Sequence, residues 1–211
     1  MGHTTDFIGH IVIEPSLNDD EIAYLTAFSE SRRCYREGGP YAVPGTPAAE
    51  RDEDIPTAQA NTGAEGQPGY WCDWVPCWDG CCLAYNGNEK FYGSVPWLKY
   101  VIQHFLKPGA RASRSGLAFF DGFTFDHVLE GMVVGCRRDN KELFAINVKN
   151  NRVTEKILRP ADPRYFDYPP LPYELEIDRW EGRRRRRRRG SKVPPDSAEV
   201  VDLATGRVIE G

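Results

Sequence analysis

Hydrophobic residues alternate along residues 7–14, a pattern typical of a β-strand. Both faces of this segment are apolar: one carries Phe7, Gly9, Ile11 and Ile13, and the other carries Ile8, His10 and Val12. Because apolar residues on both faces are typical of strands within a sheet, we expect this strand in the sheet interior. Pro15 would end it, since proline has no N–H to donate to a neighbouring strand.

A helix is predicted to follow this strand, with Asn18 as its N-cap. Glu21 lies three residues further on, which is the spacing of a capping box. Ile22, Leu25 and Phe28 then recur at helical intervals and would form the buried stripe of the helix.

The remaining pattern completes an α+β fold. Residues 70–85 are predicted to form a β-hairpin, because an Asp-Gly turn at 79–80 separates two short apolar segments. A second helix would begin at Ser94, where apolar residues recur at helical spacing. Three strands follow, at about 123–137, 142–149 and 152–158. The predicted order is β-α-ββ-α-βββ, a mostly antiparallel sheet with two helices packed on one face.

Composition divides the chain into a folded part and a C-terminal extension. We expect residues 1–158 to form the α+β domain, which carries 15 basic and 21 acidic side chains. Within it, residues 36–69 are rich in Gly, Pro, Ala and acidic residues and are predicted to be a mobile insertion or flap. Residues 159–182 would be a Pro- and Tyr-rich connector, and residues 183–211 a basic low-complexity block and tail.

Seven consecutive arginines begin this block: Arg183, Arg184, Arg185, Arg186, Arg187, Arg188 and Arg189. Because like charges repel and burial would desolvate each of them, we expect the run outside any packed core. One interpretation is a segment that binds the phosphates of RNA or DNA without reading their sequence. The other is a solvated linker, since the chain as a whole carries a net charge of -4.

Aromatic residues are concentrated in one span of 28 residues, which contains Tyr70, Trp71, Trp74, Trp78, Tyr85, Phe91, Tyr92 and Trp97. Aromatic residues at this density form either a core or a recognition surface. Both faces of the predicted strand at 70–75 carry Trp or Tyr, which is more than two helices can easily cover. We therefore predict an exposed aromatic hairpin surface, with Trp78, Tyr92 and Trp74 as partner-binding residues.

Cys72, Cys77, Cys81 and Cys82 raise the question of a zinc site, because thiolates are good zinc ligands. However, the adjacent Cys81 and Cys82 would point to opposite faces of a strand, and no histidine lies nearby in the sequence. We favour buried cysteines that pack beside the tryptophans, and we predict no metal and no cofactor. All six cysteines of the chain are expected to be free thiols.

The sequence offers weak candidates for catalysis. Asp126 and His127 are neighbours in a predicted strand, so their side chains diverge, and we interpret His127 as a structural residue at a strand end. A small hydrolase or transferase that uses His127 stays as an alternative. The acidic residues Asp52, Glu53 and Asp54 are interpreted as solvated charge rather than a cation site.

The N-terminal segment and two later motifs carry a family resemblance. The segment contains Met1, Gly2, Thr4, Thr5, Phe7, Gly9, Ile11, Ile13, Pro15 and Leu17, and the motifs are Trp-Cys-Asp-Trp-Val at 71–75 and Phe-Thr-Phe-Asp-His at 123–127. These positions resemble an uncharacterised family of actinobacterial and actinophage proteins. The resemblance covers most of residues 1–158 and none of the arginine run. It implies a cytosolic accessory protein of actinobacteria or their mobile elements, and it implies no activity.

The combined pattern predicts a non-catalytic protein-interaction module, an accessory protein of a phage or mobile element that binds a host protein through the aromatic hairpin surface. The alternatives are the nucleic-acid-associated protein and the His127 enzyme described above. No apolar run approaches the roughly 18 residues that cross a bilayer, and no basic leader precedes residues 7–13. We therefore expect a cytoplasmic protein with no membrane partner.

Overall fold

The computed structural model describes residues 4–46, 55–162, 179, 200–201 and 208–209. The chain divides into two compact units, Met1–Tyr165 and Phe166–Gly211. In the second unit, β7 (Val200–Val201) and β8 (Val208–Ile209) pair as antiparallel strands. All other elements belong to the first unit.

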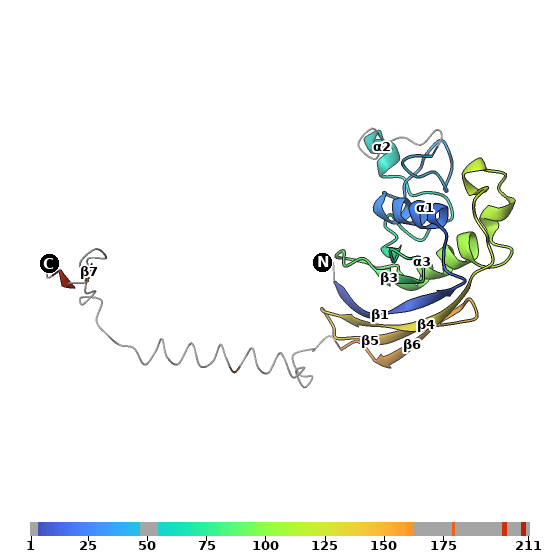
Figure 1. Ribbon diagram of the computed structural model, residues 1–211. Coiled ribbons are helices and arrows are strands. Elements are labelled where there is room, and N and C mark those ends of the chain that lie inside the picture. Colours follow the sequence, from blue (N-terminus) through green and yellow to red (C-terminus); the bar gives the residue numbers. More distant parts are fainter. Residues whose placement is uncertain (1–3, 47–54, 163–178, 180–199, 202–207, 210–211) are drawn as a thin grey trace. The chain divides into compact units, whose positions relative to one another are not determined.

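Six strands of the first unit form one antiparallel sheet in the order β2-β3-β1-β4-β5-β6 (Figure 1). Their bounds are Thr5–Glu14 (β1), Trp74–Pro76 (β2), Cys82–Tyr85 (β3), Val128–Arg137 (β4), Leu143–Lys149 (β5) and Arg152–Arg159 (β6). Strand β1 pairs with β3 on one side and β4 on the other, so the predicted interior position is confirmed. The sheet and the order of its strands and helices confirm the α+β fold.

Glycines allow the two longest strands, β1 and β4, to pair closely. Phe7 lies opposite Gly135, Gly9 opposite Val133, and Ile11 opposite Gly131. Gly9 has a φ of +110°, and a Cβ there would lie 2.5 Å from the carbonyl oxygen of Met132. The ladder between β1 and β4 therefore requires glycine at this position.

Two helices cover one face of this sheet (Figure 1). Helix α1 spans Asp19–Glu30, and α3 spans Ser94–Val101 and continues as a π-helical turn over Ile102–Leu106. Shorter helical segments are α2 (Thr57–Ala60) and 3-10 turns at Arg111–Arg114 and Ala118–Phe120. The buried side chains between the helices and the sheet include Ile11, Ile13, Leu25, Phe28, Trp97, Leu98, Ile102, Phe105, Leu129, Val133 and Ile146.

The predicted start of α1 is confirmed in its hydrogen bonds. Asn18 Oδ1 accepts from the N–H of Glu21 at 3.0 Å, and Glu21 Oε2 accepts from the N–H of Asn18 at 2.9 Å. These reciprocal bonds satisfy two of the free N–H groups at the helix start.

The first strand of the hairpin is shorter than expected. Strand β2 begins only at Trp74, because the carbonyl of Tyr70 accepts from the N–H of Arg33 and holds this stretch beside the end of α1. The predicted insertion at 36–69 is packed in its described parts: Ala42 and Val43 are buried, and Tyr24 Oη donates to the carbonyl of Tyr41 at 2.9 Å. These parts form a flap on α1.

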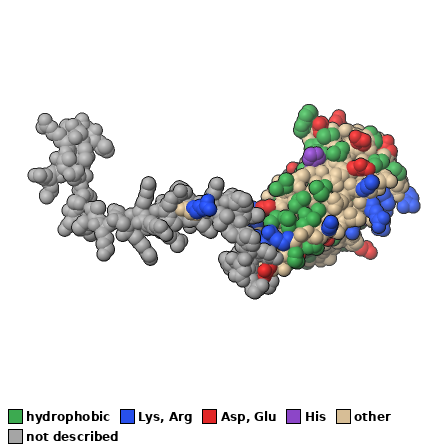
Figure 2. All heavy atoms as spheres, turned by 90° about the horizontal axis from the view of Figure 1, so that it is seen from below, with side chains coloured by type: hydrophobic (Ala, Val, Ile, Leu, Met, Phe, Trp, Pro, Cys, Tyr) green, Lys and Arg blue, Asp and Glu red, His purple; other side chains and the backbone are tan. Residues whose placement is uncertain are grey.

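The face of the sheet opposite the helices carries exposed apolar side chains. Ile8 is 78% exposed, Met132 53% and Val12 40%. Figure 2 views the unit from this side and shows hydrophobic side chains gathered among polar and charged ones. The alternation of β1 therefore places apolar residues in the core on one face and at the surface on the other. Within the described ranges, no helix has the length and apolar character needed to cross a membrane.

Trp74 and Trp78 make a matched pair for testing which part of the aromatic cluster is core. The Trp74 side chain is 1% exposed, donates from Nε1 to the carbonyl of Ser94 at 2.7 Å and packs against Phe7 and Phe91. Trp78 is 90% exposed. We expect Trp74→Ala to lower the free energy of unfolding by about 3–5 kcal/mol, and Trp78→Ala to change it by less than about 0.5 kcal/mol.

Urea unfolding followed by circular dichroism measures both values. Equal losses in the two variants would contradict the assignment of Trp74 to the core.

Candidate functional site

An aromatic pocket of about 560 Å³ lies where the chain enters β2 and leaves β3. Its aromatic wall consists of Tyr70, Trp71, Phe91, Tyr92 and Trp97. A pocket of this size with mostly apolar walls and a few polar groups is typical of a binding site. We refer to it as the aromatic pocket.

The end of α1 holds one wall of the aromatic pocket in place. The guanidinium of Arg32 lies 4.4 Å from the ring centroid of Tyr70 and 5.9 Å from that of Trp71. Arg32 Nε donates to the carbonyl of Ala60 at 2.8 Å, and Tyr70 Oη donates to the carbonyl of Asn61 at 2.7 Å. Cation–π contacts of this kind fix ring positions, so the wall is preformed.

The other wall belongs to the core. Phe91 is buried and stacks on Tyr85 with ring centroids 5.9 Å apart, while Trp97 is buried at the start of α3. A Cβ on Gly93 would lie 3.1 Å from Trp97 Cδ1, which is tighter than most such contacts. Tyr92 and Trp71, by contrast, are 57% and 44% exposed, so their rings are accessible to a ligand.

The charged side chains that line the aromatic pocket are Asp73, Glu89 and Lys90. Asp73 is buried, and its Oδ1 accepts from the side-chain amides of Asn86 at 3.1 Å and Asn88 at 3.2 Å. Burial raises the pKa of Asp73, although these two hydrogen bonds favour the carboxylate. Glu89 and Lys90 are exposed at the rim. This arrangement can orient a polar or basic ligand group without supplying a nucleophile.

The structure separates the three residues predicted to bind a partner. Tyr92 lines the aromatic pocket, whereas Trp78 lies in the turn at the opposite end of the β2–β3 hairpin. Trp74 is buried between them, so its ring is inaccessible to a partner, and we remove it from the candidate surface. Sequence reasoning chose Trp74 because it assumed a longer strand; it missed Trp71, whose only signal was its place in the same aromatic cluster.

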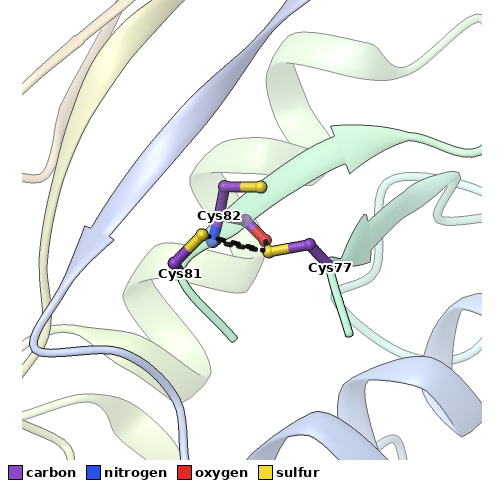
Figure 3. A group of neighbouring side chains, drawn as sticks. All are labelled: Cys77, Cys81 and Cys82. Atoms are coloured by element: carbon purple, nitrogen blue, oxygen red, sulfur yellow. Dashed lines mark hydrogen bonds between the residues drawn. The ribbon is translucent and has the colours of Figure 1, made fainter. Parts of the chain in front are cut away.

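The predicted buried role of the hairpin cysteines holds for Cys72 alone. Cys72 is fully buried, and burial raises the pKa of its thiol to about 12. Cys81 is exposed, and Cys77 and Cys82 are partly exposed. The sulfur atoms of these three lie within 4.8 Å of one another (Figure 3). The expectation that Cys81 and Cys82 diverge was wrong, because Cys81 lies before β3 and the alternation of a strand does not apply to it.

His127 is part of a buried ion pair. Its Nε2 lies 3.0 Å from Glu21 Oε1, its Nδ1 lies 2.7 Å from the carbonyl oxygen of Pro15, and both side chains are fully buried. Thr124 donates to the same Glu21 oxygen from its N–H and its hydroxyl, at 2.8 and 3.0 Å. Asp126 is exposed and lies 3.9 Å from Nδ1. The partner of His127 is therefore Glu21.

The other sequence candidates lie outside the described residues. These are Asp52, Glu53 and Asp54 in the insertion and the seven arginines Arg183–Arg189. Comparisons with protein-family models, curated proteins and solved structures found no match to this chain.

The Glu21–His127 pair predicts a pH-dependent stability. Burial alone would lower the pKa of His127, but its bonds to Glu21 and Pro15 raise it above 6.5, so its stabilisation is lost as pH rises through that raised value. Burial would raise the pKa of Glu21, but His127 and the N–H donors lower it below 4.5, so its stabilisation is lost as pH falls through that value. The pair therefore contributes most to the stability of the fold at pH values between the pKa of Glu21 and the pKa of His127.

We expect Glu21→Gln to destabilise the protein by about 3 kcal/mol at pH 5.5, since it leaves a buried partner unpaired. The loss should shrink toward pH 8, as His127 becomes neutral in the wild type. Urea unfolding across this pH range measures the difference. Glu30→Gln, at the exposed end of the same helix, is the matched control. A loss independent of pH would contradict an ionised pair.

Proposed function

We propose that this protein is a non-catalytic interaction module that binds an extended, proline-containing segment of a partner protein in the aromatic pocket. The observation that supports this most directly is the pairing of two exposed rings, Trp71 and Tyr92, with a preformed aromatic wall behind them. Exposed rings on a rigid support are typical of surfaces that bind proline-rich segments in the polyproline II conformation.

The size and charge of the aromatic pocket favour this class of ligand. Its volume of about 560 Å³ exceeds that of a single side chain and suits a short peptide segment. Its lining contains two acidic residues, Asp73 and Glu89, and one basic residue, Lys90. A basic residue beside the proline would therefore find complementary charge.

A binding role also fits the environment of the titratable groups. His127 is fully buried with both ring nitrogens engaged, so a substrate has no access to it. This arrangement argues against the hydrolase or transferase alternative. The buried acid of the aromatic pocket, Asp73, likewise has hydrogen-bond partners within the protein, the side-chain amides of Asn86 and Asn88.

The resemblance to actinobacterial and actinophage proteins supports a host protein as the partner. Six free cysteines support a reducing compartment, the cytoplasm, as the place of this interaction.

Peptide selection tests the proposal. We expect a displayed random library selected against the immobilised chain to enrich peptides with proline and a neighbouring basic residue. Trp71→Ala and Tyr92→Ala should each weaken their binding by at least roughly tenfold, because buried aromatic anchors dominate such interfaces. Isothermal calorimetry with a synthetic peptide measures the change.

Trp78→Ala is the matched control, because it removes an exposed tryptophan from the other end of the same hairpin. Its affinity should equal that of the wild type. Peptides that bind the Trp71 and Tyr92 variants as tightly as the wild type would rule out the aromatic pocket as their site.

The seven arginines favour a second candidate function, association with RNA or DNA. If all seven contact phosphates of duplex DNA, the logarithm of the affinity should fall with the logarithm of the salt concentration at a slope of roughly −6. Fluorescence anisotropy with labelled DNA measures this slope. Deletion of residues 183–189 should abolish DNA binding and its salt dependence. Deletion of residues 193–199, a segment of equal length without basic residues, should leave both unchanged. Unchanged binding after the first deletion would exclude this function.

A further inference from the structure

The turn between β2 and β3 brings three thiols together at the surface. Cys77 follows β2, Cys82 begins β3, and Cys81 precedes it. The sulfur atoms of Cys77 and Cys81 are 3.6 Å apart, and all three lie within 4.8 Å of one another (Figure 3). Among the residues that the structure describes, no other group of three or more potential metal ligands converges so closely. We call it the thiol cluster.

Backbone hydrogen bonds hold the thiol cluster in this shape. Cys77 donates from its N–H to the carbonyl of Cys82 at 2.9 Å, and Gly80 donates to the carbonyl of Cys77 at 3.0 Å. The turn depends on Gly80, whose φ is +70° and whose missing Cβ would lie within 3.0 Å of backbone atoms of Leu17.

The same turn is hydrogen-bonded to β1 and to the segment between β1 and α1. Leu17 donates from its N–H to the carbonyl of Gly80 at 3.1 Å, and Ile13 donates to the carbonyl of Cys81 at 2.8 Å. These hydrogen bonds position the backbone that carries the ligand atoms, so binding would cost little ordering of the chain.

A backbone N–H and a carboxylate lie beside the sulfur atom of Cys77. The N–H of Cys82 points to Cys77 Sγ at 2.9 Å, a donor that stabilises a thiolate. Asp79 Oδ1 lies 3.1 Å from Cys77 Sγ and accepts from the N–H of Cys81 at 3.3 Å. A bound cation would be attracted by the carboxylate and by the sulfur atoms as thiolates.

We propose that Cys77, Cys81 and Cys82 bind one zinc ion as thiolates, with the carboxylate of Asp79 as the fourth ligand. Zinc–sulfur bonds of about 2.3 Å place tetrahedral sulfur ligands about 3.8 Å apart. The Cys77–Cys81 pair, at 3.6 Å, already fits this spacing. All three sulfur atoms lie within 4.8 Å of one another, so each separation needs to close by at most roughly 1 Å to reach this spacing.

Binding would have a local consequence for the turn. Trp78 lies between the ligands Cys77 and Asp79, and its ring is 90% exposed. A zinc ion bound by the residues before and after Trp78 would restrict the backbone that carries this ring. The site is independent of the aromatic pocket, which lies at the other end of the hairpin.

Cobalt substitution in the full, reduced chain tests the proposal. Titration with Co²⁺ should give one equivalent of binding, with thiolate-to-cobalt charge-transfer absorption and the intense visible bands of a tetrahedral site. Zinc should displace the cobalt. Cys81→Ala and Cys82→Ala should each weaken zinc binding by more than roughly a hundredfold and remove charge-transfer intensity. Asp79→Asn should weaken binding by roughly tenfold while leaving that intensity in place.

Cys136→Ala, which removes a partly exposed cysteine from β4, is the matched control and should bind zinc as the wild type does. Because Cys81 is exposed, its loss should leave the melting temperature of the metal-free chain unchanged, so a lost spectrum reports a lost ligand. Wild-type binding by Cys81→Ala, or an equal loss in Cys136→Ala, would overturn the site. So would a Cys77–Cys81 disulfide in protein isolated without added oxidant, found by non-reducing peptide mapping. Unchanged affinity in Asp79→Asn would overturn the assignment of the carboxylate.

Discussion

The carboxylate of Glu21 joins two parts of the chain that are far apart in sequence. One oxygen accepts from the N–H of Asn18 at the start of α1, and the other accepts from Thr124 and lies 3.0 Å from His127, just before β4. His127 in turn contacts the carbonyl of Pro15 at the end of β1. A buried carboxylate is tolerated only when it is paired and hydrogen-bonded, so these partners must adopt one arrangement together. That arrangement positions α1 on the sheet.

The position of α1 then determines the aromatic pocket. Arg32 and Arg33 follow the end of this helix, and they hold Tyr70 through a ring contact and a backbone hydrogen bond. Tyr70 and Trp71 form the wall, and Trp74, three residues further on, enters the core. The β2–β3 hairpin therefore carries an aromatic pocket at one end and the thiol cluster at the other, with a buried tryptophan between them.

Local patterns in the sequence predicted the elements well, because their causes are local. The capping box at Asn18 and Glu21 and the three-stranded meander both depend on residues a few positions apart. The second role of Glu21 was invisible, because Thr124 lies 103 residues away. The convergence of the cysteines depends on the left-handed conformation of Gly80, which starts β3 one residue after Cys81. The burial of Trp74 depends on where β2 begins, and the segment beside α1 decides this.

The pairing of large residues with glycine along β1 and β4 also determines how these strands align. Sliding β1 by two residues would preserve the division between inward and outward side chains, so hydrophobicity alone does not forbid it. Such a slip in either direction would bring Gly9 opposite another glycine, Gly131 or Gly135, and would bring the buried Val133 opposite a large residue, Phe7 or Ile11. Complementary side-chain volume, rather than polarity, therefore distinguishes the native alignment of these strands from its nearest competitors.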